Sequence, residues 1–229
     1  GNDAHPAPLF TATDSAGNAQ PITSAPAVAL NGAVPDITTG GDANQPNLLV
    51  LFGTGQYLTA NDPGTTAGQT FYGVWDNGGD SDLSRDDLQV QETVDDAPAG
   101  ARVLTRNPVD YQDEDTPEYG WYFDLPTEGE RVVSAPLLRG DVALFSTLIP
   151  SSETCAFGGS GWNMFLDVQS GGRPLQTVID FNVDGSVDDD DRAEFDGTYR
   201  TIAGVRTDGS LPLGITYASD LLFSVDTVD

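Results

Sequence analysis

The stretch "VVSAPLL" at residues 132–138 repeats an earlier one, "ITSAPAV" at residues 22–28. Each copy continues with an apolar run and then with an aromatic run that leads into two glycines. A recurrence of this kind indicates one structural unit that is used at least twice. Because Val, Leu, Phe and Trp dominate these runs, the unit is predicted to consist of successive β-strands. The runs are "LLVLFGTG" (48–55) with "FYGVWDNGG" (71–79), and "VALFSTLI" (142–149) with "WNMFLDVQSGG" (162–172).

The rest of the chain has the same character. Short apolar runs are bounded by Gly, Pro, Asn or Asp, and helical periodicity is almost absent, with one short helix expected at Asp189–Phe195. We therefore predict an all-β fold, a partial β-propeller of four-stranded antiparallel blades. The further strand-like runs are 87–94, 101–111, 119–126, 130–138, 175–181 and 220–228.

The repeat also sets the predicted domain limits. Residues 1–21 are expected to be poorly ordered or linker-like, and residues 22–229 to form the propeller. A third copy of the unit begins near residues 213–227, so two to three blades are present, fewer than the four to eight of a closed propeller. We expect an excerpt of a longer protein, and a sandwich-like stack of sheets is the alternative.

The net charge limits the partners. The chain has 36 acidic and 9 basic residues, all nine of them arginine, for a formal charge of −27. Such a field repels nucleic acid and anionic membranes and attracts cations. No apolar run is long enough to cross a bilayer, so membrane insertion is not expected. The single cysteine, Cys155, has no partner for an internal disulfide and is expected to be buried and inert, or paired outside this segment.

The acidic run "DFNVDGSVDDDD" at residues 180–191 has the spacing of a calcium loop inserted into the propeller. Calcium prefers six to eight oxygen ligands, which such loops supply at positions 1, 3, 5, 7, 9 and 12 around a sharp turn at a glycine in position 6. Gly185 stands at position 6, and Val187 at position 8 is expected to tie the loop to the core. The predicted ligands are Asp180, Asn182, Asp184, the carbonyl of Ser186, Asp188 and Asp191. A solvated acidic turn is the alternative.

Several motifs in a fixed order resemble the C-terminal β-propeller of the PilY–PilC family of type IV pilus tip-associated adhesins. They are Gly53-Thr54-Gly55, the run from Phe71 to Asp76, Gly120-Trp121 leading to Leu125-Pro126 and Gly129-Glu130-Arg131, and Cys155 before Gly158-Gly159. The resemblance extends from about Ile22 to the end. The large N-terminal region typical of the family is missing, so activities that reside there are not claimed for this chain.

The resemblance implies a modified propeller, export through the periplasm to the bacterial cell surface, and calcium-dependent pilus extension and retraction. It also implies adhesion at the pilus tip, with pilus subunits or minor pilins and host-cell or abiotic surfaces as partners. In that family a nine-residue calcium loop closes at the position of Asp188. Asp191, whose side chain is shorter than the Glu usual at position 12, then stays outside the ligand set.

Other motifs are weaker. The tripeptide Arg139-Gly140-Asp141 is interpreted as a hairpin turn, with integrin-type adhesion as the alternative. The three tryptophans are expected in the core rather than in a sugar platform. The acids at 76–87 lack the calcium-loop pattern, and a second metal site there is the less favoured alternative. The only histidine, His5, lies in the Pro-rich start, so no Ser-His-Asp or Cys-His pair is available and no enzyme is predicted.

Three functional hypotheses remain. The first is a calcium-binding propeller of a pilus-tip adhesin and pilus-biogenesis factor, in which calcium occupancy regulates extension, retraction and attachment. The second is a structural subunit that self-associates through open strand edges into an extracellular filament or sheath. The third is a secreted calcium-binding carbohydrate-active module.

Overall fold

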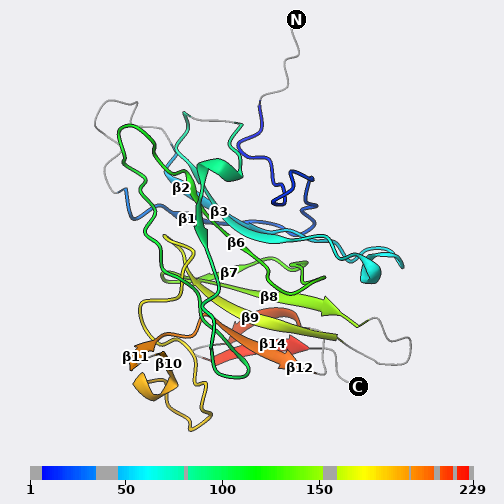
Figure 1. Cartoon of the computed structure of the whole chain (residues 1–229), viewed down its shortest axis with the longest axis vertical. Helices are drawn as coiled ribbons and strands as arrows, with labels where there is room; N and C mark the ends of the chain where they lie inside the picture. The colour runs from blue at the N-terminus through cyan, green and yellow to red at the C-terminus, as the bar shows by residue number, and fades with distance from the viewer. Residues whose placement is uncertain are drawn as a thin grey trace, which may run out of the picture.

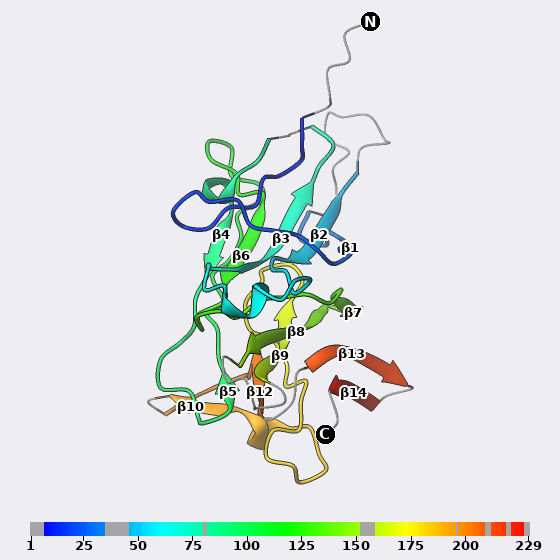
Figure 2. The same ribbon diagram turned by 90° about the vertical axis from the view of Figure 1, so that its right-hand side faces the viewer.

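The structure is a computed structural model that describes residues 7–34, 46–79, 82–151, 159–195, 197–208, 212–218 and 221–226. Within these ranges the chain forms strands and three short 3-10 turns, η1 (Asp62–Gly64), η2 (Arg85–Asp87) and η3 (Asp189–Asp191), and contains no helix that could span a membrane. The all-β prediction is confirmed. Two five-stranded sheets, stacked in Figure 2, account for most of the strands.

The first sheet has the strand order β1-β2-β3-β6-β4. Its first four strands run antiparallel, and the short β4 adds to the edge parallel to β6. The aromatic and β-branched residues of β3 explain its central position, because they favour a pleated surface that is covered on both sides. The strands are β1 (Ala27–Leu30), β2 (Leu48–Gly53), β3 (Thr70–Asp76), β6 (Gly120–Asp124) and β4 (Gln89–Gln91).

The second sheet repeats this arrangement, with the antiparallel order β7-β8-β9-β12-β5. Strands β1 and β7 both begin directly after the Pro of the Ser-Ala-Pro motif, and each is followed by the apolar and then the aromatic strand. The internal repeat is therefore confirmed, and each blade carries a fifth strand beyond the four predicted. The strands are β7 (Leu137–Arg139), β8 (Val142–Pro150), β9 (Gly159–Asp167), β12 (Gly204–Asp208) and β5 (Ala101–Arg102).

The main core lies between the two sheets. Phe71 of β3 stacks on Phe145 of β8 with ring centroids 3.7 Å apart, and Trp121 of β6 is completely buried beside Phe71. Burial of apolar surface to this extent is the main source of the stability with which one sheet packs on the other. Further buried residues of this core are Leu49, Leu51 and Phe123 from the first sheet and Ala143, Met164 and Leu166 from the second.

The outer face of the first sheet is covered by the N-terminal segment. Tyr72 and Val74 of β3 point away from the main core and pack with Phe10, Ala12 and Leu88. The Tyr72 hydroxyl donates to Gln20 Oε1 at 2.7 Å, and Gln20 in turn donates to Thr70. Residues 7–21, expected to be linker-like, therefore make specific contacts with the propeller, whereas residues 1–6 lie outside the described residues.

Three local expectations were wrong. Residues 175–181 form no strand. They lie over the outer face of the second sheet, where Val178 and Ile179 pack on Leu144 and Phe165. The helix expected at Asp189–Phe195 is a single 3-10 turn, η3, followed by strand β10 (Ala193–Phe195). The run at 101–111 contributes only the two residues of β5 and a bridge at Leu104.

Two hairpins complete the fold. Strand β10 pairs with β11 (Thr198–Arg200) at the lower end of the molecule, as seen in Figure 1. Strands β13 (Pro212–Ala218) and β14 (Leu221–Asp226) pair with each other, where the third copy of the unit was predicted, and β13 lies against β8.

Candidate functional site

The acidic loop of residues 180–191 lies in the long connection from β9 to β12, at the end of the molecule that carries the β10–β11 hairpin (Figure 2). Its two ends are anchored in a small apolar cluster, in which Phe181 and Ala193 pack with Ala101, Val103 and Ile202. Because these partners belong to β5, follow it directly or stand just before β12, the loop is fixed to the edge of the second sheet.

The first half of the loop is a series of tight turns made by its own side chains. Asp180 accepts hydrogen bonds from the backbone N–H groups of Asp184 (3.1 Å) and Gly185 (2.9 Å). Asn182 Oδ1 accepts from Asp184 N at 2.9 Å, and Asp184 Oδ1 accepts from Ser186 N at 2.8 Å. Gly185 has a φ of +93°, so the sharp turn predicted at position 6 is present.

Asp191 closes the loop from below. Its side chain is only 1% exposed, and its carboxylate accepts hydrogen bonds from the backbone N–H groups of Phe181 (2.7 Å), Asn182 (3.0 Å) and Asp188 (3.0 Å). Burial by itself raises the pKa of the Asp191 carboxyl. The three hydrogen bonds together lower the pKa by more than burial raises it, so the net result is a lowered pKa. Asp191 therefore ties the start of the loop to its end as an anion.

The donor chemistry of the loop fits a hard cation. The loop presents carboxylate and amide oxygens from the half-buried Asp180 and from the exposed Asn182, Asp184 and Asp188, and all are ligands that calcium prefers. In the part of the chain that the structure describes, however, no three acidic, His or Cys side chains converge on one point. Oxygen type and turn geometry therefore match a calcium loop, while the inward gathering of the ligands is not shown.

Two loop residues differ from expectation. Val187, predicted to tie the loop to the core, is 55% exposed, so that prediction is wrong and Phe181 and Asp191 anchor the loop instead. Val183 is 84% exposed and has a φ of +60°, a region that a β-branched residue rarely adopts. Backbone strain at this position is consistent with a loop shaped for a ligand rather than for its own packing.

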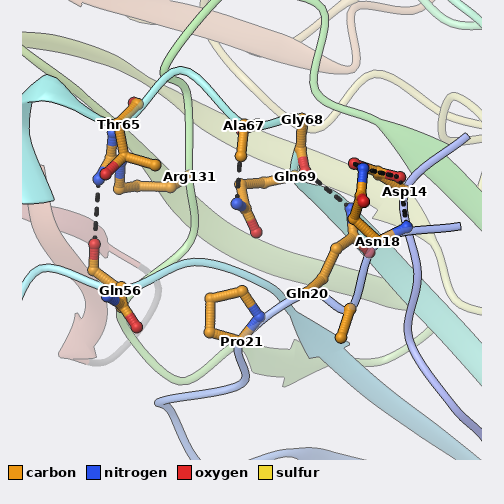
Figure 3. Close-up of a pocket in the computed structure, with 11 residues that line it drawn as sticks. Asp14, Asn18, Gln20, Pro21, Gln56, Thr65, Ala67, Gly68, Gln69 and Arg131 are labelled. Carbon is orange, nitrogen blue, oxygen red and sulfur yellow. Dashed lines mark hydrogen bonds between the residues drawn. The ribbon is translucent and has the colours of Figure 1, made fainter. Parts of the chain in front are cut away.

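A second feature is the open cavity of about 540 Å³ between the N-terminal segment and the loops at 56–69, shown in Figure 3. Gln20, Gln69 and Arg131 line it, together with Asp14 and Asn18. Most of its polar groups form hydrogen bonds within the protein, several of which Figure 3 shows as dashed lines, but Oε1 of the buried Gln69 has no hydrogen-bond partner among the described residues. The cavity could not be predicted from the sequence, because its residues come from segments far apart in the chain.

Arg131, which lines this cavity, holds the loop at 56–65 in place. Its guanidinium donates to the backbone carbonyls of Gln56 (3.0 Å), Asp62 (2.7 Å) and Thr65 (2.7 Å). The Asp62 carboxylate organises the same loop by accepting from Leu58 N, Thr59 N and Gln56 Nε2. These hydrogen bonds hold the pKa of Asp62 well below its ordinary value. Both residues therefore have structural roles, and for Arg131 this role accounts for its place in the motif at 129–131.

The remaining motifs have clear positions. Arg139-Gly140-Asp141 forms the exposed turn between β7 and β8, as predicted for a hairpin, and its adhesive role stays a prediction. Trp75 and Trp121 are buried, as expected, and Trp162 is partly buried beneath Arg102. In the acidic stretch at 76–87, Asp76 and Asp87 accept bonds from nearby backbone N–H groups. Cys155 and His5 lie outside the described residues.

Comparisons with known proteins all match this chain to PilY1 proteins. The family model of the PilY1 beta-propeller domain matches residues 4–115. A type IV pilus biogenesis factor PilY1 of Pseudomonas aeruginosa is 33% identical over 203 residues, which cover 79% of this chain and 16% of that protein. A PilY1 homolog of Xylella fastidiosa is 36% identical over 183 residues, covering 76% of this chain and 11% of that protein.

The fold agrees with the sequence matches. The crystal structure of the Pseudomonas aeruginosa PilY1 C-terminal domain superimposes with a TM-score of 0.77 at 27% identity, and the match covers 97% of this chain and 46% of that one. The chain spans less than a fifth of the length of the curated relatives it matches. Sequence, family model and fold together show that this chain belongs to the PilY1 family of type IV pilus biogenesis factors and corresponds to part of its C-terminal β-propeller region.

Proposed function

We propose that this chain is the calcium-binding propeller region of a type IV pilus tip-associated biogenesis factor and adhesin. In this proposal, calcium occupancy of the loop at 180–191 regulates pilus extension, retraction and surface attachment. The observation that carries the proposal is the loop itself, in which oxygen ligands at alternating positions surround a positive-φ glycine and a buried aspartate closes the base. The family membership supports the pilus context.

The ion would be held by Asp180, Asn182, Asp184, the Ser186 carbonyl and Asp188. Asp191 is buried and its carboxylate accepts three backbone N–H bonds, so it supports the loop from beneath rather than joining this set. Bound calcium would supply positive charge that offsets the mutual repulsion of the carboxylates. The protein's part is to present these oxygens from one tight turn whose ends are fixed by Phe181 and Asp191.

The loop contacts the second sheet, so a change in the order of the loop on calcium binding can affect that sheet. Its base packs on Ala101 of β5, which pairs with β12, and it runs through η3 directly into the β10–β11 hairpin. Ordering of the loop is therefore expected to stabilise the hairpin and the β5–β12 edge, by mass action on the bound form. A calcium-dependent surface of this kind would contact pilus subunits or minor pilins, or a host-cell or abiotic surface.

Titration calorimetry of the purified chain with calcium tests the metal site. We expect one binding event that is lost in Asp180→Ala and Asp184→Ala but retained in Asp115→Ala, which removes another exposed acid, from the loop at 110–118. Asp191→Asn is expected to weaken binding without abolishing it, because it disturbs the base of the loop and not its ligands. Equal binding by the wild type and Asp184→Ala would refute the assignment.

The cellular role needs the full-length protein. In a piliated strain, Asp184→Ala is expected to alter surface motility and attachment, while Asp115→Ala leaves both unchanged. The full-length protein is expected at the cell surface with the pilus, and immunogold labelling of intact cells checks this location. We propose binding and assembly rather than catalysis, so no substrate turnover is part of the proposal.

A further inference from the structure

Four of the nine arginines of the chain line one small pocket. The pocket has a volume of about 130 Å³ and lies between the segments at residues 106 and 173–175 and the β10–β11 hairpin. Its lining residues are Arg106, Arg173, Pro174, Leu175, Arg192, Tyr199, Arg200 and Thr201, and none of them is acidic. In a chain with 36 acidic residues, a pocket lined by four cations and no anion is not expected from general solvation.

The fold brings these arginines together from three separate parts of the chain. Backbone hydrogen bonding places the segment of Arg173 beside Thr105, next to Arg106, with an N–O distance of 3.2 Å. The antiparallel pairing of β10 with β11 sets Arg200 opposite Ala193, so that it lies near Arg192. Thr201 and Pro174 are joined across the pocket by a hydrogen bond from the Thr201 hydroxyl to the Pro174 carbonyl.

The internal partners of the four guanidinium groups do not balance their charge. Arg192 pairs with Asp189 at 2.8 Å, and Arg173 donates to the Leu104 carbonyl at 3.3 Å. Arg200 lies over the Phe195 ring, 5.1 Å from its centroid, and Arg106 has no ion pair or hydrogen bond among the described residues. By contrast, Arg102 and Arg85 elsewhere in the chain are each paired directly with a carboxylate.

The positive charges of these arginines therefore repel one another. The pKa of Arg173 is lowered, first by burial and then by the nearby charges of Arg200 and Arg106. A cluster of like charges with a single acidic partner is stabilised when an anion binds among them. Guanidinium groups converging from several directions suit a tetrahedral anion, whose oxygens accept paired N–H bonds on different sides.

We propose that Arg106, Arg173, Arg192 and Arg200 form a binding site for an oxyanion of the phosphate class. The size of the pocket suits one such group rather than a polymer, and the overall charge of −27 repels extended polyanions. Leu175 and Tyr199 form an exposed apolar rim, at 65% and 61% exposure, against which the organic part of a phosphate monoester can lie. None of the predicted calcium ligands lines this pocket.

Titration calorimetry of the whole chain with inorganic phosphate, in calcium-free buffer, tests the proposal. We expect saturable binding, and tighter binding of phenyl phosphate if the apolar rim takes part. Arg106→Glu is the informative variant, because Arg106 is exposed and its removal disturbs no internal hydrogen bond. It is expected to weaken phosphate binding by about 10- to 100-fold, the effect of losing a charge-assisted contact. The matched control, Arg139→Glu on the β7–β8 turn, is expected to bind as the wild type does.

Three outcomes would overturn the proposal. They are the absence of phosphate binding at millimolar concentrations, unchanged binding in Arg106→Glu, and succinate binding as tight as that of phosphate. A site shaped for a tetrahedral anion should prefer phosphate to succinate, whose carboxylate groups are planar. Arg200→Gln, which keeps hydrogen-bond donors while removing a charge, provides a second variant, and its thermal unfolding shows whether the hairpin remains folded. Because the titration contains no calcium, phosphate binding is scored without any contribution from an occupied acidic loop.

Discussion

The buried ion pair between Arg102 and Glu130 offers a sharp test of how the two sheets are held together. Arg102 belongs to β5 at the edge of the second sheet, and Glu130 lies in the connection from β6 to β7. The two side chains are 4% and 0% exposed and form two hydrogen bonds of 2.8 and 3.0 Å. The guanidinium also lies over the Trp162 ring, 4.0 Å from its centroid.

Replacing Glu130 with Gln removes the negative charge with almost no change in volume. The Arg102 charge would then stay buried with no anion beside it, a situation that costs about 3–5 kcal/mol in comparable pairs. For a domain of this size we expect a fall in Tm of about 6–20 °C. The double variant Arg102→Met/Glu130→Met, which removes both charges, is expected to be more stable than Glu130→Gln.

Urea unfolding followed by tryptophan fluorescence measures these differences, and one of the three tryptophans, Trp162, lies at the site. Asp189→Asn, which breaks the exposed pair with Arg192, serves as the control and is expected to change the free energy of unfolding little. A cost below about 1 kcal/mol for Glu130→Gln would refute the reasoning, since an unpaired buried charge costs more than that. So would a double variant that is less stable than Glu130→Gln.

Two further predictions follow from close contacts and from charge. Gly120→Ala should prevent correct pairing of β3 with β6, because φ at Gly120 is +126° and an added Cβ would lie 2.0 Å from the Gly73 carbonyl oxygen. Gly64→Ala, with no atom within 4 Å of its added Cβ, is the control, and soluble yield with Tm is the measurement; a well-folded Gly120→Ala protein would contradict the pairing described. The second prediction concerns Asp62, whose pKa is lower in the folded protein than its ordinary value of 3.8. The carboxylate therefore stabilises the fold fully at a pH above 3.8, and this contribution is lost as the pH falls through the lower pKa of the folded protein. Asp62→Asn should therefore lower the urea midpoint at pH 7 and have progressively less effect in acid, and an equal loss at pH 7 and at pH 2 would show that the carboxylate charge is not responsible.

The sheets could be predicted from the sequence because their signal is repeated and local. Pro26 and Pro136 mark the start of β1 and β7, and the apolar and aromatic runs that follow are strands in both copies. The segment at 175–181 shows where this reasoning ends. An apolar run looks the same whether it joins a sheet edge or lies across a sheet face, and here the outcome depends on Leu144 and Phe165, whose outward face the segment covers.

For the two sites, too, the sequence predicts the features that are local in the chain and misses those that depend on folding. The turn at Gly185 was predictable because a calcium loop is contiguous in sequence and its spacing carries the geometry. The use of Asp191 to hold three backbone N–H groups was not, since its partners become neighbours only after the loop has folded. The arginine pocket was missed for a stronger reason: its members stand at positions 106, 173, 192 and 200, and only the pairing of β10 with β11 and the contact at Thr105 bring them together.

Strand β5 precedes β6 in the chain, yet it completes the edge of the second sheet by pairing with β12. The two halves are thus interlaced, and no single cut yields one intact blade from each side. A chain severed between Asp124 and Leu137 should give fragments that stay unfolded apart and regain structure on mixing, because β5 of the first fragment pairs with β12 of the second. For evolution, this exchange makes the pair of blades, rather than the single blade, the smallest unit that can be inherited or transplanted whole.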